Sequence, residues 1–204
     1  MDVTWHGLGC FRLKERGYPA VVTDPFEDNN ATGLVLPSAR ADIVISSVPM
    51  LDPEEADYSD LRQVSHVLAG PGEYEIGGVF ITGVATSGAQ PKDDEPQQNI
   101  AYACEINDIV VCYLGALGSM PTQAQIEALG RVDVLLIPVG LPHGLKPGKA
   151  AELVSIIEPD IVIPMEYQVP GLKVEREPVE RFLKEMGEAD KAPVPSLRVS
   201  SSDV

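Results

Sequence analysis

The stretch Trp5-His6-Gly7-Leu8-Gly9-Cys10-Phe11-Arg12 places a Gly-Leu-Gly turn directly before residues that favour a strand. That strand is predicted over residues 11–13. A second strand, over residues 20–23, leads into Thr23-Asp24-Pro25-Phe26. Glycine and proline recur between short apolar runs further along the chain, a pattern that indicates many short strands separated by turns.

The rest of the first half is predicted to be mostly sheet. Its Val-, Ile- and aromatic-rich runs indicate strands at residues 42–47, 64–69, 79–84, 100–105 and 109–114. Asn107-Asp108 suits a two-residue hairpin turn, which sets Cys104 opposite Val111 and turns Cys112 to the other face. The two cysteines are therefore interpreted as core thiols. The glycine-rich stretch 70–78 lacks the order of a phosphate-binding loop and is interpreted as a turn between strands.

The second half changes to a helical period. Thr122 to Gln125 forms a capping box for a helix that Gly130 ends, and a strand over residues 133–138 follows. Pro147 begins a second helix, which leads to a strand at 160–164 and completes a β-α-β unit. A last helix opens at Pro178, and residues 196–200 are predicted to add one edge strand.

The opening stretch and the Thr-Asp-Pro-Phe segment resemble the small metallo-β-lactamase-fold hydrolases, which include lactonase-like proteins. The same order continues in residues 42–45, 70–80, 114–115, 135–140 and 161–165. This resemblance implies an α/β fold, a four-layer α/β/β/α sandwich of metallo-β-lactamase type. It places the functional site at one edge of the two sheets, where the loops after the strands converge. We expect one such domain over residues 1–204.

The chemistry of that family needs a loop of the form His-x-His-x-Asp-His, because two zinc ions jointly generate a hydroxide at neutral pH. The matching stretch here reads Val48-Pro49-Met50-Leu51-Asp52-Pro53, so only its aspartate persists. At further positions where the family carries ligands or its usual histidine, this chain has Leu8, Gly88, Ala116 and Glu166.

Only His6, His66 and His143 are present in the whole sequence, whereas a paired-zinc site of this kind takes about five imidazoles. No cofactor is therefore expected. Asp52 and Glu166 are candidates for holding a single hard ion, with His143 as a candidate third ligand. The other interpretation is that Asp52 belongs to a solvated acidic run and that Glu166 pairs with a lysine or arginine.

His143 follows a strand that borders the site in the resembling family, and it is our first choice for a reactive side chain. Ser119 acting with His143 is a further alternative, although Ser119 lies on no recognisable nucleophile elbow. Cys10 and His66 are more simply interpreted as a core thiol and a strand residue satisfied by a backbone partner. His6 stays ambiguous between these kinds of role.

Charge and composition limit the partners. The net charge of −16 has the wrong sign for binding nucleic acid or an anionic membrane. Three cysteines and the absence of a leader-like start predict a reducing, cytoplasmic setting. The oligomeric state is left open, and in a homo-oligomer Met120, Leu141 and Leu172 are candidates for apolar contacts between copies.

Two functional hypotheses follow, and whether the chain is an enzyme is left open between them. In the first, the protein is a pseudoenzyme that lost the zinc ligands and binds a small molecule or a protein partner. In the second, it is a metal-dependent hydrolase of esters or lactones with zinc or another divalent ion in an altered single-ion site. A third role, as a structural subunit beside an intact relative, completes the alternatives.

Overall fold

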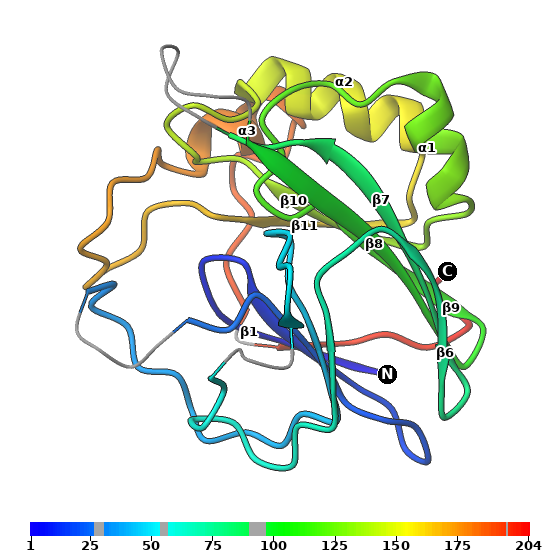
Figure 1. The fold of residues 1–204 in the computed structure, drawn as a ribbon. Helices are drawn as coiled ribbons and strands as arrows, with labels where there is room; N and C mark the ends of the chain where they lie inside the picture. Colours follow the sequence, from blue (N-terminus) through cyan, green and yellow to red (C-terminus); the bar gives the residue numbers. More distant parts are fainter. Residues whose placement is uncertain (27–30, 54–56, 90–96, 195) are drawn as a thin grey trace.

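The computed structural model describes residues 1–26, 31–53, 57–89, 97–194 and 196–204. Two six-stranded sheets face each other (Figure 1). The first has the order β12-β1-β2-β3-β4-β5, built from Ser196–Arg198, Asp2–Gly7, Cys10–Lys14, Val21–Thr23, Ile43–Ile45 and His66–Leu68. The second has the order β11-β10-β9-β8-β7-β6, built from Ile161–Met165, Val134–Pro138, Ile109–Tyr113, Gln98–Ile106, Val79–Ser87 and Gly72–Ile76.

Three helices lie on the outer face of the second sheet (Figure 1): α1 (Gln123–Leu129), α2 (Pro147–Ile157) and α3 (Glu180–Glu185). Their apolar residues pack on the outward-facing residues of β8 to β10. The outer face of the first sheet is covered, in the described part of the chain, by irregular segments that contribute Leu36, Ala41 and Leu61. The α/β sandwich is confirmed, and coil rather than helix makes its fourth layer in those segments.

The hairpin prediction is confirmed. Asn107 and Asp108 both have positive φ, and Cys104 is the register partner of Val111. Cys104 packs in the core between the sheets, whereas Cys112 packs under the helices. The alternation of side chains along β8 and β9 therefore separates the two thiols, as the register predicts.

The interpretation of residues 70–78 as a turn was wrong. Residues Gly72–Ile76 form the edge strand β6, which pairs antiparallel with β7. The turn is confined to Gly77 and Gly78, which both have positive φ. Glycines at both ends obscured a strand of alternating Glu73, Tyr74 and Glu75, and a strand of this kind suits a sheet edge because its charges discourage pairing with another chain.

The helical half agrees with its local signals. The capping box is present, with Thr122 accepting from the backbone N–H of Gln125. β10, α2 and β11 form the β-α-β unit with parallel strands, and β12 pairs antiparallel with β1 as an edge strand. No helix within the described ranges is both long enough and apolar enough to span a bilayer.

Tyr102 joins the two sheets across the main core. Its ring is fully buried, and its hydroxyl donates to the carbonyl oxygen of Ser46 at 3.1 Å, with the carbonyl of Leu68 at 3.3 Å. Both carbonyls belong to the first sheet or the segment directly after it, whereas Tyr102 lies on β8. The hydroxyl therefore supplies a donor to the Ser46 carbonyl, whereas the Leu68 carbonyl also accepts from the backbone N–H of Ser46 at 2.8 Å.

Tyr102→Phe is expected to lower the free energy of unfolding by about 1 to 2 kcal/mol, because it removes the hydroxyl that donates to the buried carbonyl of Ser46. Urea unfolding followed by tryptophan fluorescence would measure this. Tyr18→Phe is the matched control, since its hydroxyl makes only an exposed 3.4 Å contact with Asn107. Equal stability of the two variants would contradict the prediction.

Candidate functional site

Polar side chains gather at one edge of the sandwich, where strands of both sheets end. Asp24 directly follows β3, Ser46 and Ser47 follow β4, and Glu166 follows β11. Tyr113 is the last residue of β9 and is buried. In α/β sheets the carboxyl ends of parallel strands are where ligand sites form, so this edge is the candidate functional site.

Asp24 is the hub of a hydrogen-bond network at this edge. Its Oδ1 accepts from the backbone N–H of Ser47 at 2.6 Å, and its Oδ2 accepts from the Tyr113 hydroxyl, also at 2.6 Å. The Ser47 hydroxyl also donates to Oδ2. Because Ser47 follows the first sheet and Tyr113 ends a strand of the second, the carboxylate ties the two sheets together.

The turn between β1 and β2 makes room for this network. A Cβ atom on Gly9 would collide with the Tyr113 hydroxyl, so a side chain there would prevent that hydroxyl from reaching Asp24. The Thr23 hydroxyl donates to the carbonyl of Gly9 at 2.5 Å and accepts from the N–H of Phe11 at 2.9 Å. The glycine turn and the end of β3 are therefore held in a fixed relation just below the carboxylate.

Glu166 forms an ion pair at the same edge. The Nε of Arg176 donates to Glu166 Oε2 at 2.6 Å, and the side chains are only 12% exposed for Glu166 and 18% for Arg176. The backbone N–H of Glu166 donates to the carbonyl of Leu8 at 3.3 Å, which ties this residue to the turn between β1 and β2. The pairing of Glu166 with a basic residue, one of the two interpretations of this position, agrees with this geometry.

Burial governs the ionisation of these groups. It raises the pKa of the Asp24 carboxyl, although the donors from Ser47 and Tyr113 oppose the rise. It also raises the pKa of Glu166, with the charge and hydrogen bond of Arg176 acting in the opposite direction. The pKa of Tyr113 is raised well above its ordinary value by burial and then by the Asp24 carboxylate. Tyr113 therefore stays a hydrogen-bond donor.

Two loops pack backbone to backbone beside the network, at positions where the resembling family carries ligands. The N–H of Ala89 donates to the carbonyl of Ala116 at 2.7 Å. The N–H of Gly118 donates to the carbonyl of Ser87 at 2.8 Å. A Cβ atom on Gly118 would collide with the Gly88 backbone. Asn99, buried on β8, donates to Leu114 and accepts from Ala116, which holds this packing together.

The structure separates the residues that the sequence suggested for chemistry. Asp52 is exposed on the loop after β4, and His143 is exposed in the turn between β10 and α2. Ser119 is likewise exposed. Among the described residues, no group of three or more His, Cys, Asp or Glu side chains is placed to hold a metal ion. Asp52, Glu166 and His143 are thus not assembled into one such group.

The remaining candidates have simple environments. Cys10 is fully buried and its pKa is raised, chiefly by burial, so it stays a thiol. His66 lies exposed at the start of β5, with its Nδ1 3.0 Å from the Ser65 hydroxyl rather than bonded to a backbone group. His6 is partly buried, and its Nε2 has no partner among the residues that the structure describes.

Sequence reasoning missed Asp24, Ser47, Tyr113 and Arg176 as site residues. Asp24 carried a signal, since it stands directly after a buried strand in the Thr-Asp-Pro-Phe segment. Ser47 and Tyr113 had weaker signals of the same kind, at the ends of predicted strands. Arg176 had none, because it lies in an irregular segment and reaches Glu166 only through the tertiary fold.

Two facing sheets, helices on an outer face and polar residues at the carboxyl edge define an α/β sandwich of metallo-β-lactamase type. The chain matches the family model described as "Beta-lactamase superfamily domain" over residues 2–166. It therefore belongs to the β-lactamase superfamily domain family.

Similar proteins span nearly the same length. A candidate Zn-dependent hydrolase of the metallo-β-lactamase superfamily from Thermotoga maritima is 34% identical, with a TM-score of 0.70, covering 90% of this chain and 84% of its own. A UPF0173 protein of Pyrococcus furiosus is 28% identical, over 91% of this chain and 90% of its own. A "UPF0173 metal-dependent hydrolase" of Archaeoglobus fulgidus is 24% identical, over 87% of each chain.

Proposed function

We propose that this protein is a pseudoenzyme of the family: a single sandwich domain, residues 1–204, that has exchanged the zinc centre for protein hydrogen bonds and binds a small molecule or a protein partner. The observation that carries the proposal is the engagement of both carboxylates at the edge. Asp24 accepts from Ser47 and Tyr113, and Glu166 accepts from Arg176.

This donor set does not fit a paired-zinc centre. Zinc in such centres takes imidazole nitrogens together with carboxylates, and a positive guanidinium beside a ligand would oppose a cation. Arg176 already supplies the positive charge that a metal would offer to Glu166. The backbone packing of Gly88 against Gly118 also occupies space in which longer ligand side chains would need to extend.

The loop after β4 supports a binding role. Val48 is 59% exposed and Leu51 is fully exposed, on the segment that matches the family's metal loop. Apolar side chains that stand in solvent at a site edge are typical of surfaces that contact a ligand or partner. Two of the residues suggested as contacts of a homo-oligomer are poorly placed to touch a second copy, since Leu172 is buried and Met120 packs under the helices. A cytoplasmic location and the exclusion of nucleic acid stay predictions from the composition.

The alternative function is a metal-dependent hydrolase with an altered single-ion site. It is favoured by one finding, the similarity to relatives described as metal-dependent hydrolases. Asp52, Glu166 and His143 are its ligand candidates. For this alternative to hold, the loops that carry Asp52 and His143 would have to move toward Glu166, and Glu166 would have to release Arg176.

Metal content separates the two functions. Protein purified without chelator, offered zinc, manganese, magnesium and calcium and then dialysed, is expected to retain less than about 0.1 ion per chain. The reason is that both edge carboxylates are already bonded to protein donors. Elemental analysis by mass spectrometry would measure this. A stoichiometric ion that survives dialysis would contradict the pseudoenzyme proposal.

Ester and lactone turnover gives the second readout. Activity above background that is lost in Asp52→Ala and in Glu166→Gln, but kept in Asp57→Ala, would establish the hydrolase. Asp57 is the matched control because it is an exposed acid close to Asp52 in the sequence. The expected result is that the wild type and all three variants show no turnover above background.

A further inference from the structure

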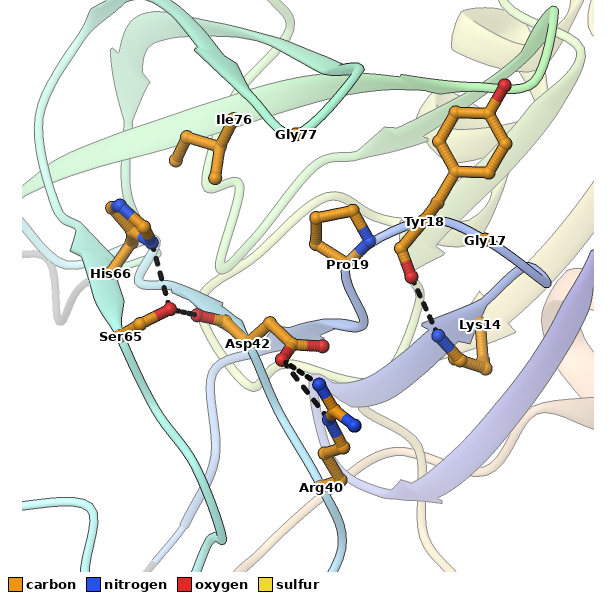
Figure 2. A pocket seen from close by; sticks show the side chains of 10 residues that line it. All are labelled: Lys14, Gly17, Tyr18, Pro19, Arg40, Asp42, Ser65, His66, Ile76 and Gly77. Carbon is orange, nitrogen blue, oxygen red and sulfur yellow. Dashed lines mark hydrogen bonds and ion pairs between the residues drawn. The ribbon is translucent and has the colours of Figure 1, made fainter.

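A pocket lies at the other end of the first sheet from the candidate site, where β3, β4 and β5 begin rather than end (Figure 2). Its cavity volume is about 560 Å³. Its walls come from four separate segments: the end of β2 with the turn after it, residues 40–42, the start of β5, and the β6–β7 turn. The volume lies within the range of small-molecule sites. The Asp24 network belongs to the opposite, carboxyl edge of the same strands.

Cations converge on this pocket in a protein of net charge −16. Residues 1–70 contain five lysines and arginines: Arg12, Lys14, Arg16, Arg40 and Arg62. Lys14 and Arg40 line the pocket. Arg12 donates to the carbonyl of Arg40 at 2.9 Å, and Arg62 is the backbone bridge partner of Arg40, so both residues neighbour a residue that lines the pocket. Arg16 belongs to the adjoining turn.

The lining carries an excess of one positive charge. Arg40 donates through both Nε and Nη2 to Asp42 Oδ1, at 3.1 and 2.8 Å, and so neutralises the carboxylate in the pocket. Asp42 Oδ2 is occupied by the N–H of Ala20 at 2.8 Å. Lys14 donates one bond, to the carbonyl of Tyr18 at 2.7 Å, and an ammonium has three donors. The Lys14 ammonium and the Nη1 of Arg40 can therefore donate hydrogen bonds to an anion in the pocket.

The rest of the wall combines the polar Ser65 and His66 with an apolar part. Figure 2 shows Tyr18, Pro19 and Ile76 around the cavity beside the two cations. The shape is held by close backbone packing, because a Cβ atom on Gly77 would stand 2.8 Å from Pro19 Cγ, and Gly77 has a φ of +57°. An apolar wall beside a few convergent charged donors is the usual composition of a site for a small organic ion.

We propose that this pocket binds a small monocarboxylic acid, with its carboxylate between Lys14 and Arg40 and its apolar body on Tyr18, Pro19 and Ile76. One excess charge in the lining matches one negative charge on the ligand. A phosphate monoester would bring close to two charges toward the Asp42 carboxylate, which favours the monoanion. The site is independent of the pseudoenzyme proposal, since it shares no residue with the Asp24 edge.

The test is an NMR titration of the full-length protein with phenylacetate, neutral phenylacetamide, phenyl phosphate and inorganic phosphate. Phenylacetate is expected to bind saturably with a Kd of about 1 mM. The amide shifts should centre on Gly17, Tyr18, His66 and Gly77. Phenylacetamide is expected to bind at least about tenfold more weakly, because it keeps the phenyl ring but replaces the negative carboxylate with a neutral amide.

Lys14→Met and Arg40→Gln should each weaken phenylacetate binding at least about fivefold. Lys149→Met and Arg181→Gln remove the same charges from exposed positions on α2 and α3, and should leave the Kd within about twofold. The proposal is overturned by absence of saturation at about 10 mM, by shifts centred elsewhere, or by equal binding of the amide. Tighter binding of phenyl phosphate or inorganic phosphate would overturn the assignment to monocarboxylates.

Discussion

Arg176→Met is expected to lower the free energy of unfolding by about 3 to 5 kcal/mol, because it leaves the poorly exposed Glu166 carboxylate without its counter-charge. Denaturant unfolding at neutral pH would measure the loss. Arg181→Met is the control: this residue is 67% exposed, pairs with Glu177 on the surface, and should cost no more than about 1 kcal/mol. The double variant Glu166→Gln/Arg176→Met should recover a large part of the stability, since it removes the uncompensated charge.

The loss in Arg176→Met should depend on pH in a defined direction. Burial raises the pKa of Glu166, and Arg176 opposes the rise, so removing the arginine raises that pKa further in the folded state. A carboxyl with a raised folded-state pKa favours folding at low pH and loses that contribution as pH rises through the folded value. The variant should therefore approach the wild type in stability as the pH falls toward 4.5. A loss that is constant from pH 4.5 to pH 8 would contradict the assigned ion pair.

Asp24→Ala is expected to cost about 3 kcal/mol, because it leaves the Ser47 N–H, the Ser47 hydroxyl and the Tyr113 hydroxyl without their acceptor. Tyr113→Phe alone should cost less, about 1 kcal/mol, and the double variant should cost less than the sum of the two. Thermal and denaturant unfolding of the wild type, the two single variants and the double variant would give the four stabilities of this double-mutant cycle. Additive losses would show that the Asp24 and Tyr113 side chains act independently.

Asp24→Asn separates the shape of this group from its charge. The amide oxygen keeps an acceptor for the Ser47 N–H, and the amide nitrogen can donate to the oxygens of the two hydroxyls, so the cost should be smaller than for alanine. Burial raises the pKa of Asp24, so the wild type takes up a proton more readily when folded and loses stability relative to the amide as pH rises above about 4. A difference that grows in favour of the wild type with rising pH would contradict this sign.

The local features of the fold could be predicted where neighbouring residues decide them. The Asn107-Asp108 turn sets the register of β8 against β9, because the two residues adopt positive φ at low cost. The Thr122 capping box begins α1 in the same local way. β6 could not be recognised as easily, because its strand character comes from pairing with β7 at the sheet edge rather than from its glycine-rich composition.

The candidate site was only partly predictable. Glu166 was recognised from its match to a ligand position of the resembling family, with an ion pair as one of its two interpretations, but no pattern marked Arg176 as the partner. Asp52 and His143 were candidates from the family pattern alone, and their loops lie in solvent. Loop conformation depends on packing across the sheet edge, which spacing along the chain does not encode.

The sequence by itself determined the order of the helices and of the strands other than β1 and β6, the turn chemistry and the scarcity of histidine, because each depends on residue type or on neighbours in the chain. Only the tertiary structure decided which groups meet. Tyr113 lies 89 residues from Asp24 along the chain, yet their side chains share a hydrogen bond across the two sheets. The cationic pocket likewise draws on four segments separated in sequence. Contacts of this kind form because burying the two apolar sheet faces against each other fixes where the polar strand ends must lie.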